Sequence, residues 1–345
     1  MPKKIILIVG NRPQFIKLAP LSMELKKNKK LSEVIIHTGQ HYENEMSDIF
    51  FSELNITKPK YFLNVKAKHH GAMTARMIEG VEKALLIEKP ELVFVFGDTN
   101  STLAGALAAS KLSIPIAHVE SGLRSYNNKM PEEINRIVTD RISDFLFCPT
   151  SNAVNNLKKE GIIKNVHNVG DLMYEINLYI QQLNKEKKRV DKKKYSNQQF
   201  ILLSIHRQES TSSLNKFLQL LEYTHEFATQ EKMKIFFPIH PRLKKWRKEI
   251  EKFKQILIMS PLSYLETQYL LSKCNYVFTD SGGLQKEAYF HKVLCVTLRH
   301  ETEWIETIDN GWNRLWTNKN YKPQKIINEY GNGKTSKEIL KYINI

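Results

Sequence analysis

The stretch LVFVFGDTNSTLAGALAAS at residues 92–110 decides the fold class of this 345-residue chain. Its first five residues are continuously apolar, which is typical of a parallel strand buried on both faces. A glycine and several polar residues then mark a turn, and residues 102–110 have the apolar periodicity of a helix. A strand, a polar turn and a helix in this order predict an α/β fold with a parallel sheet.

The same alternation recurs in two arrays, which a charged stretch at residues 185–194 separates. We therefore predict two Rossmann-like, doubly wound domains that face each other across a cleft, with residues 1–171 in the first and 172–335 in the second. Ligands of such sheets bind beyond the carboxyl ends of the strands. The predicted strands are 4–9, 33–37, 92–96, 114–118 and 144–148 in the first array, and 200–205, 234–239, 256–259, 276–279 and 293–298 in the second.

The charge balance is strongly basic, with 52 Lys and Arg against 36 Asp and Glu, or +16 overall. Only eleven of the 52 are Arg, the residue that nucleic-acid readers use most. We interpret the excess as a lysine-covered surface and expect no nucleic-acid partner, although an anionic small substrate fits the charge. No run approaches the ~18 apolar residues of a membrane span, so we expect a cytoplasmic protein without membrane contact. Three cysteines are too few for a disulfide framework or a metal cluster.

The first strand end carries GNRPQFIK at residues 10–17. It lacks the G-x-G-x-x-G pattern of dinucleotide sites. Pro13 near the start of a helix, together with Arg12 and Lys17, suits a phosphate or pyrophosphate. An ordinary strand-to-helix turn with surface charges is the alternative.

Three carboxylates stand at neighbouring strand ends of the first array. Asp98 follows the third strand, although it could simply cap the next helix, and Glu120 follows the fourth, where it could pair with Arg124. Glu132 opens a helix whose dipole favours the ionised carboxylate, four residues before Arg136. Acid–base catalysis needs such groups within reach of one carbon centre, so the set predicts proton-transfer chemistry.

The second array carries anion-binding features at its strand ends. His206 and Arg207 follow its first strand, and Arg299 closes its last. A histidine satisfied by its surroundings is the alternative for His206. The pattern DSGGLQKE at 280–287 is sharper, because its two glycines let backbone N–H groups point outward at a helix start. Glu287 lies about one and a half turns into that helix, within reach of a ribose diol beside the phosphates. A glycine turn without a ligand is the alternative.

Taken together, the chain resembles the non-hydrolysing UDP-N-acetylglucosamine 2-epimerase family. The resemblance extends from residue 4 to about 316 and rests on R-P-Q-F-I-K, T-G-Q-H-Y, F-G-D-T-N-S-T, H-V-E-S-G-L-R, P-E-E-I-N-R, H-R-Q-E-S, D-S-G-G-L-Q-K-E and T-E-W, in that order. It implies the GT-B arrangement of two domains, with UDP held mainly by the second. It also implies a C-terminal helix, at about 336–345, that packs back onto the first domain.

The resemblance implies a reaction that needs no NAD and no other cofactor. UDP leaves C1 as C2 loses its proton, a 2-acetamidoglucal forms, and UDP adds again after the proton returns to the opposite face of C2. The products would be UDP-GlcNAc and UDP-ManNAc. By motif, the catalytic candidates are Asp98, Glu120, Glu132 and His206. The candidates for binding UDP and the substrate are Arg12, Lys17, Arg136, Arg207, Ser281, Gly282, Gly283, Glu287 and Arg299.

The motifs leave two alternatives open. Where many members have T-E-R-P-E, this chain has tryptophan at position 304, and that form is similar to a subgroup that acts on UDP-2,3-diacetamido-glucuronate. A GT-B glycosyltransferase is the other alternative. Several bacterial members also bind a second UDP-sugar, for which Gln40, His41 and His240 are the candidates here. We expect a homodimer.

Overall fold

The computed structural model of the chain describes residues 2–39, 56–65, 67, 69–186 and 198–343. It divides into two compact units. Unit 1 consists of Met1–Leu178 and Asn328–Ile345, and unit 2 of Tyr179–Ile327. The chain first passes from unit 1 to unit 2 within the helix α7 (Leu172–Glu186).

The strands of unit 1 are β1 (Lys3–Val9), β2 (Leu31–His37), β3 (Tyr61–Phe62), β4 (Leu92–Phe96), β5 (Ile116–Val119), β6 (Phe145–Cys148) and β7 (Val166–Asn168). They form one sheet in the order β3-β2-β1-β4-β5-β6-β7, and all their pairs are parallel. The apolar residues of β1 and β4 are fully buried, because helices cover both faces of the sheet. This burial explains why their apolar runs do not alternate.

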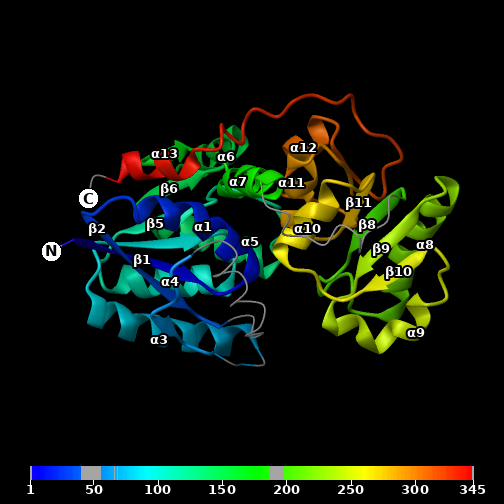
Figure 1. Cartoon of the computed structure of the whole chain (residues 1–345). Coiled ribbons are helices and arrows are strands. Elements are labelled where there is room, and N and C mark those ends of the chain that lie inside the picture. The colour runs from blue at the N-terminus through cyan, green and yellow to red at the C-terminus, as the bar shows by residue number, and fades with distance from the viewer. Residues whose placement is uncertain (1, 40–55, 66, 68, 187–197, 344–345) are drawn as a thin grey trace. The chain divides into compact units, whose positions relative to one another are not determined.

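The remaining helices of unit 1 are α1 (Arg12–Leu25), α3 (His70–Glu88), α4 (Asn100–Lys111), α5 (Pro131–Ile142), α6 (Ser151–Lys159) and α13 (Thr335–Tyr342). Side chains of α3 and α4 share one core cluster with alternate residues of β1, β2 and β4. The C-terminal helix α13 packs against α1, and both lie on the side of the sheet away from α3 (Figure 1).

Capping side chains fix where the helices of unit 1 begin after the strands. Asn11 and Gln14 form a capping box at the start of α1, and Thr99 and Thr102 form one at the start of α4. In a capping box the two side chains satisfy backbone N–H groups that the helix leaves open. Because Thr99 is the N-cap of α4, the alternative that Asp98 is merely that cap is wrong.

The strands of unit 2 are β8 (Phe200–Ser204), β9 (Lys234–Pro238), β10 (Ile256–Met259), β11 (Tyr276–Thr279), β12 (Leu294–Thr297) and β13 (Asn313–Leu315). They form a second parallel sheet, in the order β10-β9-β8-β11-β12-β13. Its helices are α8 (Leu214–Gln230), the 3-10 helix η2 (Pro241–Trp246), α9 (Arg247–Ile250), α10 (Tyr264–Leu271), α11 (Gly282–Phe290) and α12 (Ile305–Asp309). Two parallel sheets with crossover helices confirm the predicted fold class.

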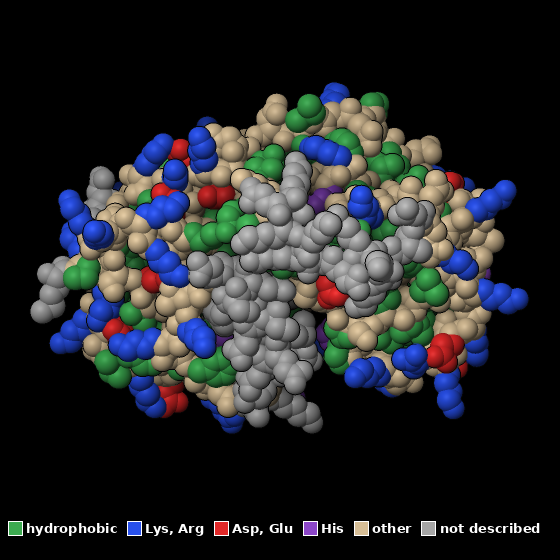
Figure 2. Space-filling view, viewed as in Figure 1, with side chains coloured by type: hydrophobic (Ala, Val, Ile, Leu, Met, Phe, Trp, Pro, Cys, Tyr) green, Lys and Arg blue, Asp and Glu red, His purple; other side chains and the backbone are tan. Residues whose placement is uncertain are grey.

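The basic side chains are spread over the surface. Figure 2 shows Lys and Arg scattered across the visible face, between apolar and uncharged polar side chains. Such a mixed surface keeps a charged protein soluble without requiring a polyanionic partner. The expectation of no nucleic-acid partner stays a prediction.

Candidate active site

The carboxyl ends of β1 and β4 are tied together by one buried side chain. The Gln14 amide donates to the Phe96 carbonyl over 2.7 Å and to the Thr99 hydroxyl over 2.9 Å. Its oxygen accepts from the Gly10 amide over 2.7 Å. The first turn of α1 is therefore hydrogen-bonded to the end of β4. The motifs at residues 10–17 and 97–102 thus lie together at the carboxyl ends of the strands.

Lys17 and Glu120 form a buried ion pair at this edge. Glu120 follows β5 in the left-handed backbone region, with a φ of 70°, which few non-glycine residues adopt. Gly97 lies directly beside the pair, since a Cβ there would come within 3.2 Å of both Lys17 Nζ and Glu120 Oε2. This close approach and the φ of 65° at position 97 both favour glycine there. Lys17, which we expected to bind phosphate, contacts a carboxylate in the structure.

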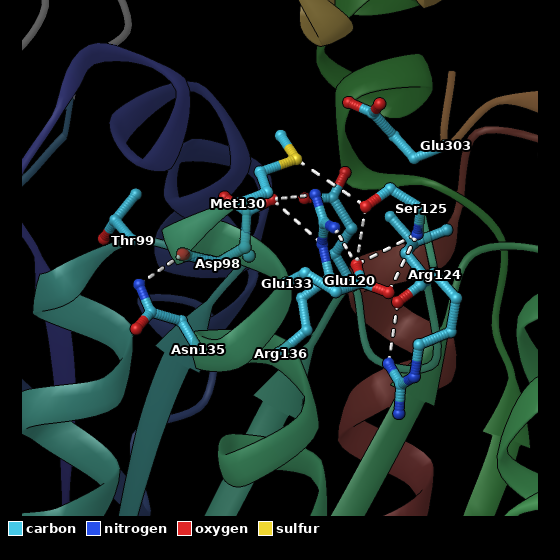
Figure 3. A network of polar contacts seen from close by, with 12 residues as sticks. Asp98, Thr99, Glu120, Arg124, Ser125, Met130, Glu133, Asn135, Arg136 and Glu303 are labelled. Carbon is cyan, nitrogen blue, oxygen red and sulfur yellow. Dashed lines mark hydrogen bonds and ion pairs between the residues drawn. The ribbon is translucent and has the colours of Figure 1, made fainter. Parts of the chain in front are cut away.

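A second ion-paired cluster joins the end of β4 to α5 (Figure 3). The guanidinium of Arg136 is almost fully buried and donates to Asp98 Oδ2 over 2.6 Å and to Glu133 Oε2 over 2.6 Å. Asn135 also donates to the Asp98 carbonyl over 2.9 Å. Because the Asp98 carboxylate keeps 29% of its surface exposed, Arg136 orients it while leaving it accessible.

Glu133 was missed in the sequence analysis, although it is the buried partner of Arg136. Burial alone would raise the pKa of Glu133, but N–H groups of Ser125 and Tyr126 and the charge of Arg136 outweigh burial and hold the pKa below its usual value. An ionised, fully engaged carboxylate fixes a loop better than it shuttles protons. The predicted candidate Glu132 is its neighbour on the first turn of α5, where it is half-buried.

Arg124 does not pair with Glu120, so that alternative is wrong. Its guanidinium instead contacts Asp140 Oδ2 over 2.7 Å and both oxygens of Glu160, over 2.6 and 2.7 Å. Glu120 is therefore held by Lys17, a cation from a different strand end. The structure brings Asp98, Glu120 and the first turn of α5 to one edge of the unit 1 sheet.

Unit 2 presents a different kind of site. The fully buried carboxylate of Asp280 accepts from the backbone N–H of His206 over 3.0 Å and of Arg207 over 2.9 Å. Asp280 thus shapes the turn after β8, and the His206 side chain remains 41% exposed. The ring of His240, a predicted second-site residue, lies 6.1 Å from that of His206 between centroids.

The start of α11 carries the double-glycine motif. Ser281 is the N-cap, so the amides of Gly282 and Gly283 open the helix, where no earlier turn supplies an acceptor. Gly282 lies against Glu303, and a Cβ at position 282 would lie 2.3 Å from Glu303 Oε1, so that side chain would have to shift. Glu287 is buried on the second turn of the same helix.

Two arginines of the predicted binding set converge on Glu303. Arg299 donates to Glu303 Oε2 over 2.9 Å, and the Arg207 guanidinium lies 3.7 Å from Oε1. Glu303 was not predicted, although it belongs to the T-E-W motif. In this same loop Trp304 packs beneath Lys286, whose ammonium lies 3.7 Å from the ring centroid.

Some predictions fall outside what the structure describes. Gln40 and His41, and the side chain of Arg12, lie outside the described residues. Within the described ranges, no three His, Cys, Asp or Glu side chains gather closely enough to hold a metal ion. Nor is any described helix long and apolar enough to cross a bilayer.

Comparison with known proteins gives consistent matches over nearly the whole chain. A family model described as UDP-N-acetylglucosamine 2-epimerase matches residues 23–344. A UDP-N-acetylglucosamine 2-epimerase homolog of Methanococcus maripaludis is 50% identical over 320 residues, which cover 90% of this chain and 88% of that protein. The UDP-2,3-diacetamido-2,3-dideoxy-D-glucuronate 2-epimerase of Pseudomonas aeruginosa is 45% identical, again over 90% of this chain and 88% of that protein.

Solved structures match the fold as well. The Methanocaldococcus jannaschii UDP-GlcNAc 2-epimerase, in complex with UDP-GlcNAc and UDP, has a TM-score of 0.88 and 41% identity over 99% of both chains. The Neisseria meningitidis UDP-GlcNAc 2-epimerase, bound to UDP-GlcNAc, has a TM-score of 0.86 and 28% identity over 98% of both chains.

Proposed function

Because the chain belongs to the UDP-N-acetylglucosamine 2-epimerase family, we propose that it interconverts UDP-GlcNAc and UDP-ManNAc without NAD. The observation that carries the proposal is the edge of the unit 1 sheet. There Asp98 and Glu120 each lie against a buried cation, beside the first turn of α5 that carries Glu132. Proton removal from one face of a carbon and return to the other needs more than one such group.

The chemistry assigns different work to the two units. A C2 proton without an adjacent carbonyl is not acidic, so cleavage of the C1–O bond runs ahead and positive charge builds on the sugar ring. Fixed carboxylates stabilise that charge and exchange the proton. Asp98, Glu120 and Glu132 take these roles in the proposal. Lys17 holds Glu120 in place and Arg136 aims Asp98, because both cations already face these carboxylates.

We assign the departing diphosphate to unit 2. The free amides at the start of α11 and the positive end of its dipole suit an anion. His206 lies on the turn that Asp280 shapes and assists at the phosphates, and Glu287 reaches the ribose. Arg207 and Arg299, which meet at Glu303, complete the predicted set.

A related substrate is the second candidate. The P. aeruginosa protein named for UDP-2,3-diacetamido-2,3-dideoxy-D-glucuronate is 45% identical to this chain, about as similar as the M. maripaludis protein named UDP-N-acetylglucosamine 2-epimerase, at 44%. The same C2 chemistry would then act on a sugar with different substituents at C3 and C6.

A solvent-exchange experiment tests both candidates. The purified protein is incubated in D₂O with UDP-GlcNAc, UDP-2,3-diacetamido-glucuronate or UDP-glucose, without NAD, and proton NMR follows C2. We expect deuterium at C2 of an acetamido sugar and little free UDP. Absence of label from every acetamido sugar would contradict the proposal, and stoichiometric UDP release would indicate hydrolysis or glycosyl transfer instead.

We further propose a cytoplasmic location and a homodimer. The three cysteines are buried free thiols, which fits a reducing compartment. Exposed Ile134 and Ile137 on α5 give unit 1 an apolar surface that a second copy would cover. Sedimentation equilibrium tests the oligomer: a mass of one chain at micromolar concentration would contradict it.

A further inference from the structure

A fully buried histidine lies two residues before Glu120. His118, on β5, has no exposed surface. Its Nε2 lies 2.7 Å from the Gly97 carbonyl oxygen, and its Nδ1 lies 2.7 Å from Asp140 Oδ1. A carbonyl oxygen only accepts, so Nε2 carries a proton and donates it to Gly97. Because both ring nitrogens are engaged and shielded, His118 cannot touch a substrate.

Asp140, on α5, extends this contact to the next loop. Its second oxygen accepts from Arg124 Nη1 over 2.7 Å and from the Gly122 amide over 3.2 Å. Arg124 in turn binds both oxygens of Glu160, just after α6. The Asp140 and Arg124 side chains are at most 1% exposed. A buried charged network of this kind is costly unless every member is paired.

The network fixes two loops whose backbones have unusual conformations. The φ angles are 65° at Gly97, 70° at Glu120 and 77° at Gly122. Of these three residues only Glu120 has a Cβ, and the left-handed conformation is strained for such a residue. Such strain persists only where the surrounding structure over-determines it. His118 holds the Gly97 carbonyl and Asp140 holds the Gly122 amide, so each loop is fixed within two residues of its carboxylate.

We propose that His118 and Asp140 are positioning residues, which hold the β4–α4 and β5–α5 loops at a fixed spacing for the acid–base steps. The inference rests on the proposed function. It explains why a buried ion-paired network stands where an apolar packing would suffice for stability. A displacement of about 1 Å between reacting groups costs roughly a hundredfold in rate.

Two substitutions at His118 separate its two hydrogen bonds. The amide nitrogen of His118→Gln reaches the place of Nε2 and keeps the bond to Gly97, while that of His118→Asn reaches the place of Nδ1 and keeps the bond to Asp140. Only the Asn variant releases the Gly97 carbonyl beside Asp98, whereas in the Gln variant Asp140 keeps its bonds to Gly122 and Arg124. We therefore expect kcat for C2 exchange to stay within about threefold in the Gln variant and to fall about a hundredfold in the Asn variant. UDP affinity, measured by calorimetry, stays unchanged in both, because unit 2 holds the nucleotide.

His167→Asn is the matched control, since it makes the same substitution in unit 1 on β7, away from the site. Its kcat should equal that of the wild type. Equal losses in the two His118 variants, no loss in either, or a loss that follows the unfolding midpoint would overturn the inference. If His118→Asn does not fold, Asp140→Asn tests the other loop, where kcat must fall with UDP affinity kept. An inactive wild-type protein would instead refute the proposed function.

Discussion

The two units differ in the chemical groups that they place at the carboxyl ends of their strands. Unit 1 uses side-chain ion pairs: Lys17 with Glu120, and Arg136 with Asp98. Unit 2 also pairs Arg299 and Arg207 with Glu303, but it adds backbone groups: the Asp280 carboxylate accepts from two amides of the turn after β8, and amides of Gly282 and Gly283 open α11. Paired side chains tune proton transfer, whereas free amides bind an anion without exchanging protons with it.

This difference predicts that substitutions in the two units will affect different kinetic properties. A change in the unit 1 pairs should lower the rate of the chemical step and leave nucleotide affinity intact. A change at the start of α11 should do the reverse. Kinetics distinguish the two cases, because loss of an interaction made only in the transition state lowers kcat, while loss of uniform binding raises KM.

The largest effect is expected for Glu120→Gln. The substitution keeps the shape of the side chain but removes the charge that faces Lys17 and the ability to exchange a proton. General acid–base catalysis contributes about 10²–10⁴-fold, so kcat for C2 exchange should fall by about 10³. UDP affinity should stay within twofold by calorimetry. A variant that exchanges at the wild-type rate would remove Glu120 from the chemistry.

A smaller effect of the opposite kind is expected for Gly282→Ala. The added methyl carbon would lie 2.3 Å from Glu303 Oε1, so Glu303 must move away from Arg299. We expect UDP affinity to fall about tenfold, or ~1.4 kcal/mol, with kcat at saturation little changed. Gly71→Ala is the control, since a Cβ there meets nothing within 4 Å. Unchanged UDP affinity in Gly282→Ala would place the nucleotide elsewhere.

The central strands were predictable from sequence because burial on both faces leaves continuous apolar runs. The central strands β4 and β11 match their predicted bounds to the residue, and so does the edge strand β10, whose four residues are all apolar. The edge strands β3, β7 and β13 were missed, since each has only two or three residues. An edge strand that short carries too little periodicity to stand out from a loop.

For the candidate site, the sequence predicted which types of residue are present but not which side chains pair with each other. Glu132 and Glu133 are adjacent and chemically alike, and only the phase of α5 decides that Glu133 points inward to Arg136. The pairing of Lys17 with Glu120 spans 103 positions, which only the assembled sheet brings together. Contacts between residues so far apart in the sequence cannot be read from the spacing of residues within one motif. The carboxyl-end rule for parallel sheets is what made the neighbourhood itself predictable.

The last prediction concerns stability at acid pH and not activity, and it depends on a buried histidine that each unit contains. Each has a histidine whose pKa burial lowers to about 4: His37 in unit 1 and His291 in unit 2. Between pH 6.5 and 4 the unfolded chain binds these protons and the folded one does not, so stability must fall as pH falls through this window. His291→Gln keeps a donor for Gln268 and removes one of the two protonation sites.

Thermal unfolding midpoints measured from pH 7 to pH 3 test this prediction. His37 is present in both proteins, so its contribution cancels and the difference between the curves reports on unit 2 alone. We expect the wild type to lose about 2 kcal/mol more than His291→Gln by pH 5, and the gap to stop widening below pH 4. His300→Gln, at an exposed histidine of the same unit, should follow the wild type. Parallel curves for His291→Gln and wild type would mean that His291 is protonated in the folded protein, and the acid sensitivity would then belong to unit 1.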